Sequence, residues 1–201
     1  MRIISGTLKG RTVNAPKNFQ LRPTTDIAKE ALFNILNNEY DFDEISVLDL
    51  FAGIGSISLE CASRGTTDIV SVERNAQHAT FIKKTAQDFK LQGITVLCND
   101  VRDFLKIAYR SFDIIFADPP YDLPWIAQLP EYIFNSQAAN SETVVIIEHP
   151  AEVSYAAHPC YSHTKQYGKV HFSWLQPPKS PSGGLSEEKT NEFPQNNSIN
   201  N

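Results

Sequence analysis

Short apolar stretches that alternate with segments of helical length are the feature that most restricts the fold of this 201-residue sequence. Each stretch is rich in Val and Ile and too short for a helix, which is typical of buried strands. Strands that alternate with helices require a parallel sheet with helices on both faces. We therefore predict an α/β domain with strands at 47–50, 69–73, 95–97, 113–117 and 144–147, and helices near 56–64, 75–90, 101–109 and 125–137.

The two ends of the chain depart from this alternation. Residues 2–14 predict a β-hairpin, because β-prone pairs flank a turn with Gly6 and Gly10. A further helix follows Asp26, with apolar residues at 27, 28, 31, 32, 35 and 36. Residues 162–166 and 170–175 predict a second hairpin at the edge of the sheet.

We divide the chain into an N-terminal arm (1–25), a main domain (26–176) and a tail (177–201). The tail consists largely of Pro, Ser, Gly, Asn and Glu, and so few apolar residues cannot offset the entropy of ordering. We expect it to be disordered.

Composition excludes several protein classes. Apolar residues make up 41% of the chain, as in globular proteins, and no run of them is long enough to span a membrane. The first residues lack a signal-peptide pattern, so we expect a cytoplasmic protein. Three widely spaced cysteines, Cys61, Cys98 and Cys160, indicate free thiols rather than disulfides or a zinc site.

Positive charge is concentrated in the arm. The net charge is −5, yet the first 25 residues contain five cations and no acid, so the remainder carries −10. A basic arm on an acidic domain suggests contact with a polyanion, although a solvated surface hairpin would explain it equally well.

Two glycines, Gly53 and Gly55, follow the first strand and let the backbone approach a ligand closely. A dinucleotide fingerprint requires a third glycine, and Ser58 occupies that position. Asp49, just before the glycines, would repel a pyrophosphate and attract an ammonium group.

Acids also stand at the ends of the next two strands. Glu73 can accept hydrogen bonds from ribose hydroxyls, and Asp100 from an adenine amino group. Each acid alone could simply cap a helix, Asp100 in particular the helix that begins at Val101. Together they favour a ligand with an amino acid, a ribose and an adenine but no phosphate, which describes S-adenosylmethionine.

Asp118, Pro119, Pro120 and Tyr121 follow the fourth strand. The prolines stiffen the loop and remove two donors, which leaves the Asp118 carboxylate and the Pro119 carbonyl as acceptors beside an aromatic ring. Such a site suits a nucleobase with an NH2 group, flipped out of its helix. Acceptors on both hydrogens stabilise the positive charge that develops on the nitrogen, and positioning supplies much of the remaining rate. The alternative is a Pro-Pro turn with Tyr121 packed on the surface.

Other polar residues give no comparable pattern. We interpret Glu148 and His149, at the fifth strand end, as structural. His158, His163 and His171 lack metal-ligand spacing, and no G-x-S-x-G motif is present.

The sequence resembles the RsmD family of bacterial 16S rRNA guanine-N2 methyltransferases over residues 1–176. The resemblance is carried by Met1-Arg2-Ile3-Ile4-Ser5-Gly6, Leu21-Arg22-Pro23-Thr24-Thr25-Asp26, Leu48-Asp49-Leu50-Phe51-Ala52-Gly53-Ile54-Gly55, Asp118-Pro119-Pro120-Tyr121 and Tyr167-Gly168. It implies a class I S-adenosylmethionine-dependent methyltransferase, Rossmann-like, with a mostly parallel seven-stranded sheet that ends in an antiparallel hairpin.

The resemblance also implies the substrate and the roles of individual residues. The substrate would be a 16S rRNA guanine, of the guanine-966 type, in the 30S subunit or its assembly intermediate. We expect a monomer that needs no metal and contacts no membrane. Asp118, Pro119, Pro120 and Tyr121 would be catalytic. Asp49, Phe51, Ala52, Gly53, Gly55, Glu73, Arg74, Asp100 and Val101 would bind the cofactor, and Arg2, Lys9, Arg11, Arg22, Thr24 and Thr25 would bind RNA.

Some features leave alternatives open. Family members often have Phe at Tyr121 and a more basic helix after Asp26, and the tail has no counterpart in them. An adenine-N6 or other amino-methyltransferase acting on nucleic acid or protein, and a non-catalytic RNA-binding assembly factor, remain alternatives.

Overall fold

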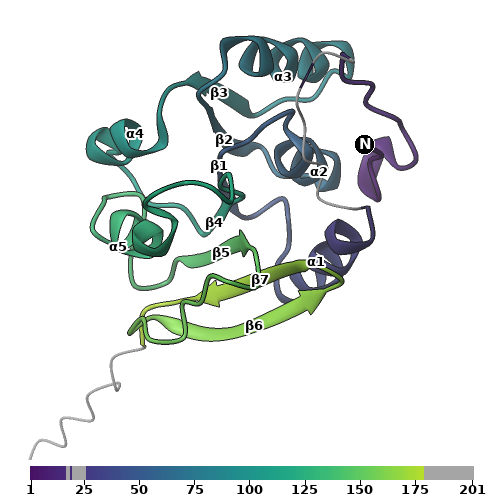
Figure 1. The fold of residues 1–201 in the computed structure, drawn as a ribbon. Coiled ribbons are helices and arrows are strands. Elements are labelled where there is room, and N and C mark those ends of the chain that lie inside the picture. The colour runs from purple at the N-terminus through teal and green to yellow at the C-terminus, as the bar shows by residue number, and fades with distance from the viewer. Residues whose placement is uncertain (17–18, 20–25, 179–201) are drawn as a thin grey trace, which may run out of the picture.

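The computed structural model describes residues 1–16, 19 and 26–178. Within them lies one seven-stranded sheet with the order β3-β2-β1-β4-β5-β7-β6 (Figure 1). The first five strands of the chain are parallel, whereas β7 runs antiparallel to β5 and to β6. The strands are β1 (Ser46–Leu50), β2 (Asp68–Glu73), β3 (Ile94–Cys98), β4 (Ile114–Ala117), β5 (Val144–His149), β6 (Tyr161–Tyr167) and β7 (Val170–Leu175).

Helices cover both faces of this sheet (Figure 1). One face packs against α1 and α2, and the opposite face against α4 and α5. The helical elements are η1 (Gly6–Leu8), α1 (Asp26–Glu39), α2 (Ser56–Arg64), α3 (Ala76–Asp88), α4 (Val101–Ile107), η2 (Ile126–Gln128) and α5 (Leu129–Phe134).

The alternation of side chains along the strands fixes which residues face which helices. On β1, Val47 packs in the cluster with α1 and α2, whereas Leu48 and Leu50 pack in the cluster with α4 and α5. All three are almost completely buried. Strands buried on both faces explain the continuous apolar runs of the sequence.

The predicted α/β class, the parallel sheet and the late hairpin are confirmed. The segment 125–137, predicted as one helix, instead forms the 3-10 turn η2 and the short helix α5. Pro130 is the reason for the break, because proline has no N–H and is tolerated only in the first turn of a helix.

The N-terminal β-hairpin prediction is wrong in detail. The chain does reverse, with Ile3 N donating to Arg11 O at 2.9 Å, but only the single bridge between Arg2 and Thr12 forms. The backbone N–H groups of Ile4 and Ser5 bind the carboxylate of Glu60 instead of a second strand. A regular strand therefore cannot continue past Ile3.

The remaining expectations concern membrane spans, metal sites, cysteines and the division of the chain. No helix among the described residues is long and apolar enough to cross a membrane, and the same residues contain no group of three potential metal ligands. All three cysteines are free thiols, and Cys61 is buried. The predicted division of the chain stays a prediction, and the tail from residue 179 on lies outside the described residues.

Candidate cofactor and catalytic site

A cleft of about 1100 Å³ opens at the carboxyl ends of the central parallel strands. Loops after β1, β2, β3 and β4 line it, as expected for a ligand site of an open α/β sheet. The structure therefore brings most of the predicted site residues together. The predicted residues that line the cleft are Phe51, Ala52, Gly53, Glu73, Arg74, Asp100, Val101, Asp118, Pro119, Pro120 and Tyr121.

The loop after β1 turns sharply into α2. Phe51 has φ of 62°, which is unusual for a bulky residue, and Gly53 has φ of 56°. Gly55 does not line the cleft. A Cβ there would lie 3.1 Å from the Ile82 side chain, so Gly55 allows α2 and α3 to pack closely.

Glu73 connects the glycine loop to the start of α3. Its Oε2 accepts from Gly53 N at 2.8 Å and its Oε1 from Asn75 N at 2.7 Å. A carboxylate offers about four acceptor positions, so Glu73 can also accept from hydroxyl groups in the cleft. Its position is compatible with the predicted contact to a ribose.

Asp100 combines the two roles that the sequence left open. It is the N-cap of α4, where its Oδ1 accepts from Arg102 N at 2.9 Å. It also lines the cleft. Capping and ligand contact are therefore compatible at this position.

Asp49 does not lie where the sequence analysis expected it. It is only 2% exposed and does not line the cleft, because it pairs with Ser71, two residues before Glu73, and lies beneath the start of α2. Its Oδ2 accepts from Ser58 N at 3.1 Å and Ser58 Oγ at 2.5 Å. Burial raises the pKa of Asp49 to about 7. The geometry makes Asp49 a support of the α2 start rather than a partner of a ligand ammonium.

The loop after β4 lines the cleft beside the glycine loop, because β4 and β1 are neighbouring strands. Asp118 N donates to Leu50 O at 3.4 Å, which ties the loop to β1, and Leu123 N donates to Pro120 O at 2.9 Å. Tyr121 is half-buried, and its hydroxyl donates to Glu148 Oε1 at 3.4 Å. The surface-turn alternative does not describe this loop, because all four of its residues face the cleft.

Glu148 therefore has a closer connection to the site than the sequence analysis gave it. Ala117 and Ile147 are paired in the β4–β5 register, so Glu148 follows beside Asp118. The available signal was that Asp118 follows β4 and Glu148 lies near the end of β5, because the carboxyl ends of parallel strands lie at one edge of the sheet. His149 points elsewhere: its Nε2 lies 2.7 Å from Ser173 Oγ, and burial lowers its pKa.

Sequence analysis also missed the aromatic side of the cleft. Trp125 lies 6.0 Å from the Phe51 ring, and the Arg102 guanidinium lies over Trp125 at 5.0 Å. The short distance from Tyr121 to Trp125 in the sequence was the available signal. The further lining residues are Met1, Asp26, Ile54, Ser56, Asn75, His78, Asp122 and Leu123.

The predicted RNA-binding residues divide into two groups. Arg2, Lys9 and Arg11 are exposed on the N-terminal arm, and Arg11 also lies over the Phe89 ring at 4.8 Å. The other three, Arg22, Thr24 and Thr25, lie outside the described residues.

The residues in the cleft fit S-adenosylmethionine. Carboxylates on adjacent strand ends offer acceptors to hydroxyl and amino groups, and an apolar, aromatic side offers stacking for a base. The Glu73 carboxylate already accepts from Gly53 N, and the loop has no third glycine and no lysine, so the cleft is unsuited to a pyrophosphate.

Comparisons with known proteins show the family to which the chain belongs. The model of the family described as "Conserved hypothetical protein 95" matches residues 1–176. YlbH of Bacillus subtilis is 34% identical over 157 residues, covering 76% of this chain and 84% of that protein. Ribosomal RNA small subunit methyltransferase D of Buchnera aphidicola is 27% identical, covering 86% and 90%.

A solved structure supports the fold. The 16S rRNA guanine-N2 methyltransferase RsmC of Thermus thermophilus, in complex with S-adenosylmethionine and guanosine, superposes with a TM-score of 0.63. It is 20% identical, and the match covers 81% of this chain and 45% of that one. By the family match and these relatives, the chain belongs to the RsmD family of rRNA methyltransferases.

Proposed function

We propose that this S-adenosylmethionine-dependent methyltransferase modifies the exocyclic N2 amine of a guanine in 16S rRNA, of the guanine-966 type. The substrate would be the 30S subunit or its assembly intermediate, met in the cytoplasm by a monomer of this chain. One observation carries the proposal: the loop at 118–121 and the strand-end acids Glu73 and Asp100 line the same cleft. The residue roles below are part of the proposal.

The cofactor would lie along the strand ends. Glu73 would accept from the ribose hydroxyls, Asp100 from the adenine amino group, and Trp125 would pack against the base. When bound, the cofactor supplies an activated methyl group on its sulfonium. The residues of the chain therefore have to position the acceptor nitrogen and exclude water, and they need no strong base.

The loop after β4 would hold the guanine. The Asp118 carboxylate and the Pro119 carbonyl would accept the two N–H bonds of the amine, which stabilises the charge that develops on nitrogen. The Tyr121 ring would stack on the flipped base. The guanosine bound to the Thermus thermophilus RsmC neighbour supports guanine over adenine.

Replacing Asp118 tests the proposed chemistry. Asp118→Ala should reduce methyl transfer to unmodified 30S subunits at least 100-fold, by the usual cost of removing an electrostatic stabiliser. S-adenosylmethionine affinity, measured by calorimetry, should stay within about twofold, because Asp118 would contact the base. Asp103→Ala, on the exposed side of α4, is the matched control and should retain full activity.

The outcomes separate the remaining alternatives. Wild-type protein that binds 30S subunits but transfers no methyl group would indicate an assembly factor. N6-methyladenine as the product would indicate an adenine enzyme. Persistent activity in Asp118→Ala would contradict the role given to this residue.

A further inference from the structure

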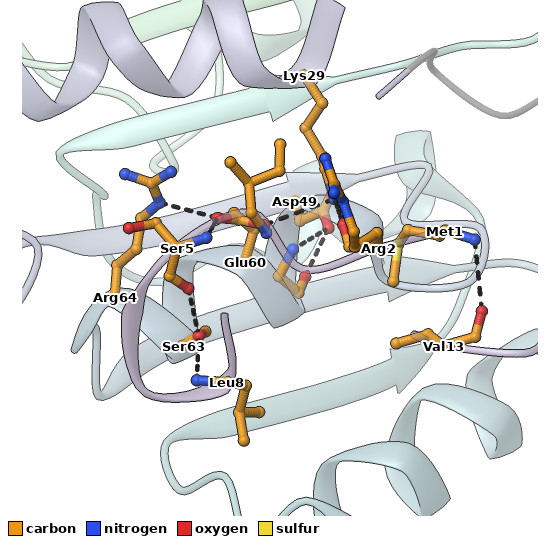
Figure 2. A network of polar contacts seen from close by, with 12 residues as sticks. Met1, Arg2, Ser5, Leu8, Val13, Lys29, Asp49, Glu60, Ser63 and Arg64 are labelled. Carbon is orange, nitrogen blue, oxygen red and sulfur yellow. Dashed lines mark hydrogen bonds and ion pairs between the residues drawn. The ribbon is translucent and has the colours of Figure 1, made fainter. Parts of the chain in front are cut away.

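Three charged side chains lie buried beneath the N-terminal arm, outside the cleft. Lys29 of α1 and Glu60 of α2 have side chains that are 1% and 0% exposed, and Arg64 of α2 is 6% exposed. Figure 2 shows Lys29 and Arg64 converging on Glu60. We call these three residues the ionic cluster.

The ionic cluster holds the backbone of the arm. Lys29 Nζ donates to Arg2 O at 2.7 Å, and Glu60 accepts from Ile4 N at 2.8 Å and Ser5 N at 3.0 Å (Figure 2). Both cations also contact Glu60, with Lys29 Nζ at 3.5 Å and Arg64 Nε at 3.0 Å. The ionic cluster thus binds three successive peptide groups of the arm, through Arg2 O, Ile4 N and Ser5 N.

A second set of contacts fixes the arm one helical turn further along α2. Ser63 Oγ donates to Ser5 O at 2.6 Å and accepts from Leu8 N at 3.0 Å. Gly6, at φ of +78°, packs so closely that a Cβ would lie 1.8 Å from Ser63 O. The backbone of the arm at Gly6 therefore lies directly against the backbone of α2.

The three buried charges of the ionic cluster position the arm rather than attach it. Burying charges is costly, and burial lowers the pKa of Lys29 despite the nearby carboxylate. Ile3 and Val13 already anchor the arm by apolar contacts with Leu59 and Ala86. Directional, charge-assisted hydrogen bonds add a precise position to that attachment.

That position matters because the arm borders the cleft. Met1 lines the cleft, while Arg2, Lys9 and Arg11 are exposed on the same arm. We propose that Lys29, Glu60 and Arg64 are positioning residues that hold the arm ready at the edge of the cleft, so that RNA phosphates bound to its cations place the target base at the 118–121 loop. The inference rests on the proposed function, since it takes RNA as the ligand of the arm.

Lys29→Met tests this inference, because it keeps most of the side-chain volume and removes only the charged donor. If the docked arm falls to about a tenth of the population, the KM for unmodified 30S subunits rises about tenfold while the S-adenosylmethionine Kd stays unchanged. The kcat should change less than twofold. Amide hydrogen exchange at Ile4 and Ser5 should accelerate. Lys106→Met, at an exposed ion pair, is the matched control.

A double-mutant design separates positioning from general destabilisation. The triple variant Arg2→Ala, Lys9→Ala, Arg11→Ala should itself raise the KM and lower the salt dependence of RNA binding. Adding Lys29→Met to that variant should not raise the KM further, because the arm no longer carries the charges that the ionic cluster positions. Fully additive losses, or an unchanged KM in Lys29→Met, would overturn the inference.

A pair of glycine variants covers the case in which Lys29→Met does not fold. Gly6 and Gly10 both have positive φ, but a Cβ at Gly10 meets nothing within 4 Å. Gly6→Ala should displace the arm and raise the KM about tenfold, and Gly10→Ala should not. Equal KM values would overturn the inference. If wild-type protein transfers no methyl group, the proposed function fails instead, and hydrogen exchange alone still reports whether the cluster holds the arm.

Discussion

Asp49→Asn should make the stability of the protein less dependent on pH. Asp49 is 2% exposed, and desolvation raises the pKa of its carboxyl from 3.8 to about 7, even though two hydrogen bonds from Ser58 favour the charged form. The folded state thus favours the protonated acid. Its contribution to stability is fully present below the unfolded pKa and is lost as the pH rises through 7.

The size of the effect follows from the two pKa values. Between pH 5 and pH 8 the folded carboxyl releases a proton that the unfolded carboxyl has already lost. A folded pKa of about 7 corresponds to a loss of roughly 2 to 3 kcal/mol of unfolding free energy over this range. Asparagine cannot ionise, and its amide oxygen can still accept from Ser58 N. The variant should therefore lack this loss.

Urea unfolding at several pH values between 5 and 8 measures the difference. The wild-type free energy of unfolding should fall relative to that of Asp49→Asn by roughly 2 to 3 kcal/mol across the range. Asp103→Asn, at an exposed site on α4, should follow the wild-type curve. Parallel curves for wild type and Asp49→Asn would refute the reasoning and show that Asp49 stays ionised in the fold.

Three further predictions concern the cleft and the backbone. Tyr121→Phe keeps the stacking ring and loses one hydrogen bond to Glu148, so kcat should fall by no more than about tenfold. Adding Glu148→Gln to this variant should not lower kcat by the same factor again, because the two residues share that hydrogen bond. Trp125→Ala should weaken S-adenosylmethionine binding about tenfold in calorimetry, because the cleft loses an aromatic surface; an unchanged Kd would exclude a contact. Gly93→Ala places a Cβ 2.1 Å from Thr67 O and should cost about 3 kcal/mol in urea unfolding, clearly more than Gly168→Ala, where the space is open.

The local pattern of apolar residues was sufficient to predict the α/β architecture of the main domain from the sequence. The apolar runs at β1, β4 and β5 are buried on both faces, so their length and composition identify them without tertiary information. Parallel strands then place all of their carboxyl ends at one edge. The convergence of Glu73, Asp100 and Asp118 on one cleft follows from that rule.

The misplaced residues depend on contacts between distant parts of the chain. Asp49 faces the same side of the sheet as Glu73 but lies earlier along its strand, where it pairs with Ser71, and a serine nine residues away makes burial possible there. The arm reverses with a single bridge rather than two regular strands, because Glu60, more than fifty residues later, binds the N–H groups of Ile4 and Ser5. Periodicity in a window of a dozen residues cannot detect either partner.

The central claim is the transfer of a methyl group to guanine N2 of 16S rRNA, and the product nucleoside tests it most directly. Purified protein and labelled S-adenosylmethionine are incubated with 30S subunits from a strain that lacks the enzyme, and the RNA is digested to nucleosides for mass spectrometry. We predict N2-methylguanosine at a single position, and none with Asp118→Ala. N6-methyladenosine, or label confined to ribosomal protein, would contradict the account.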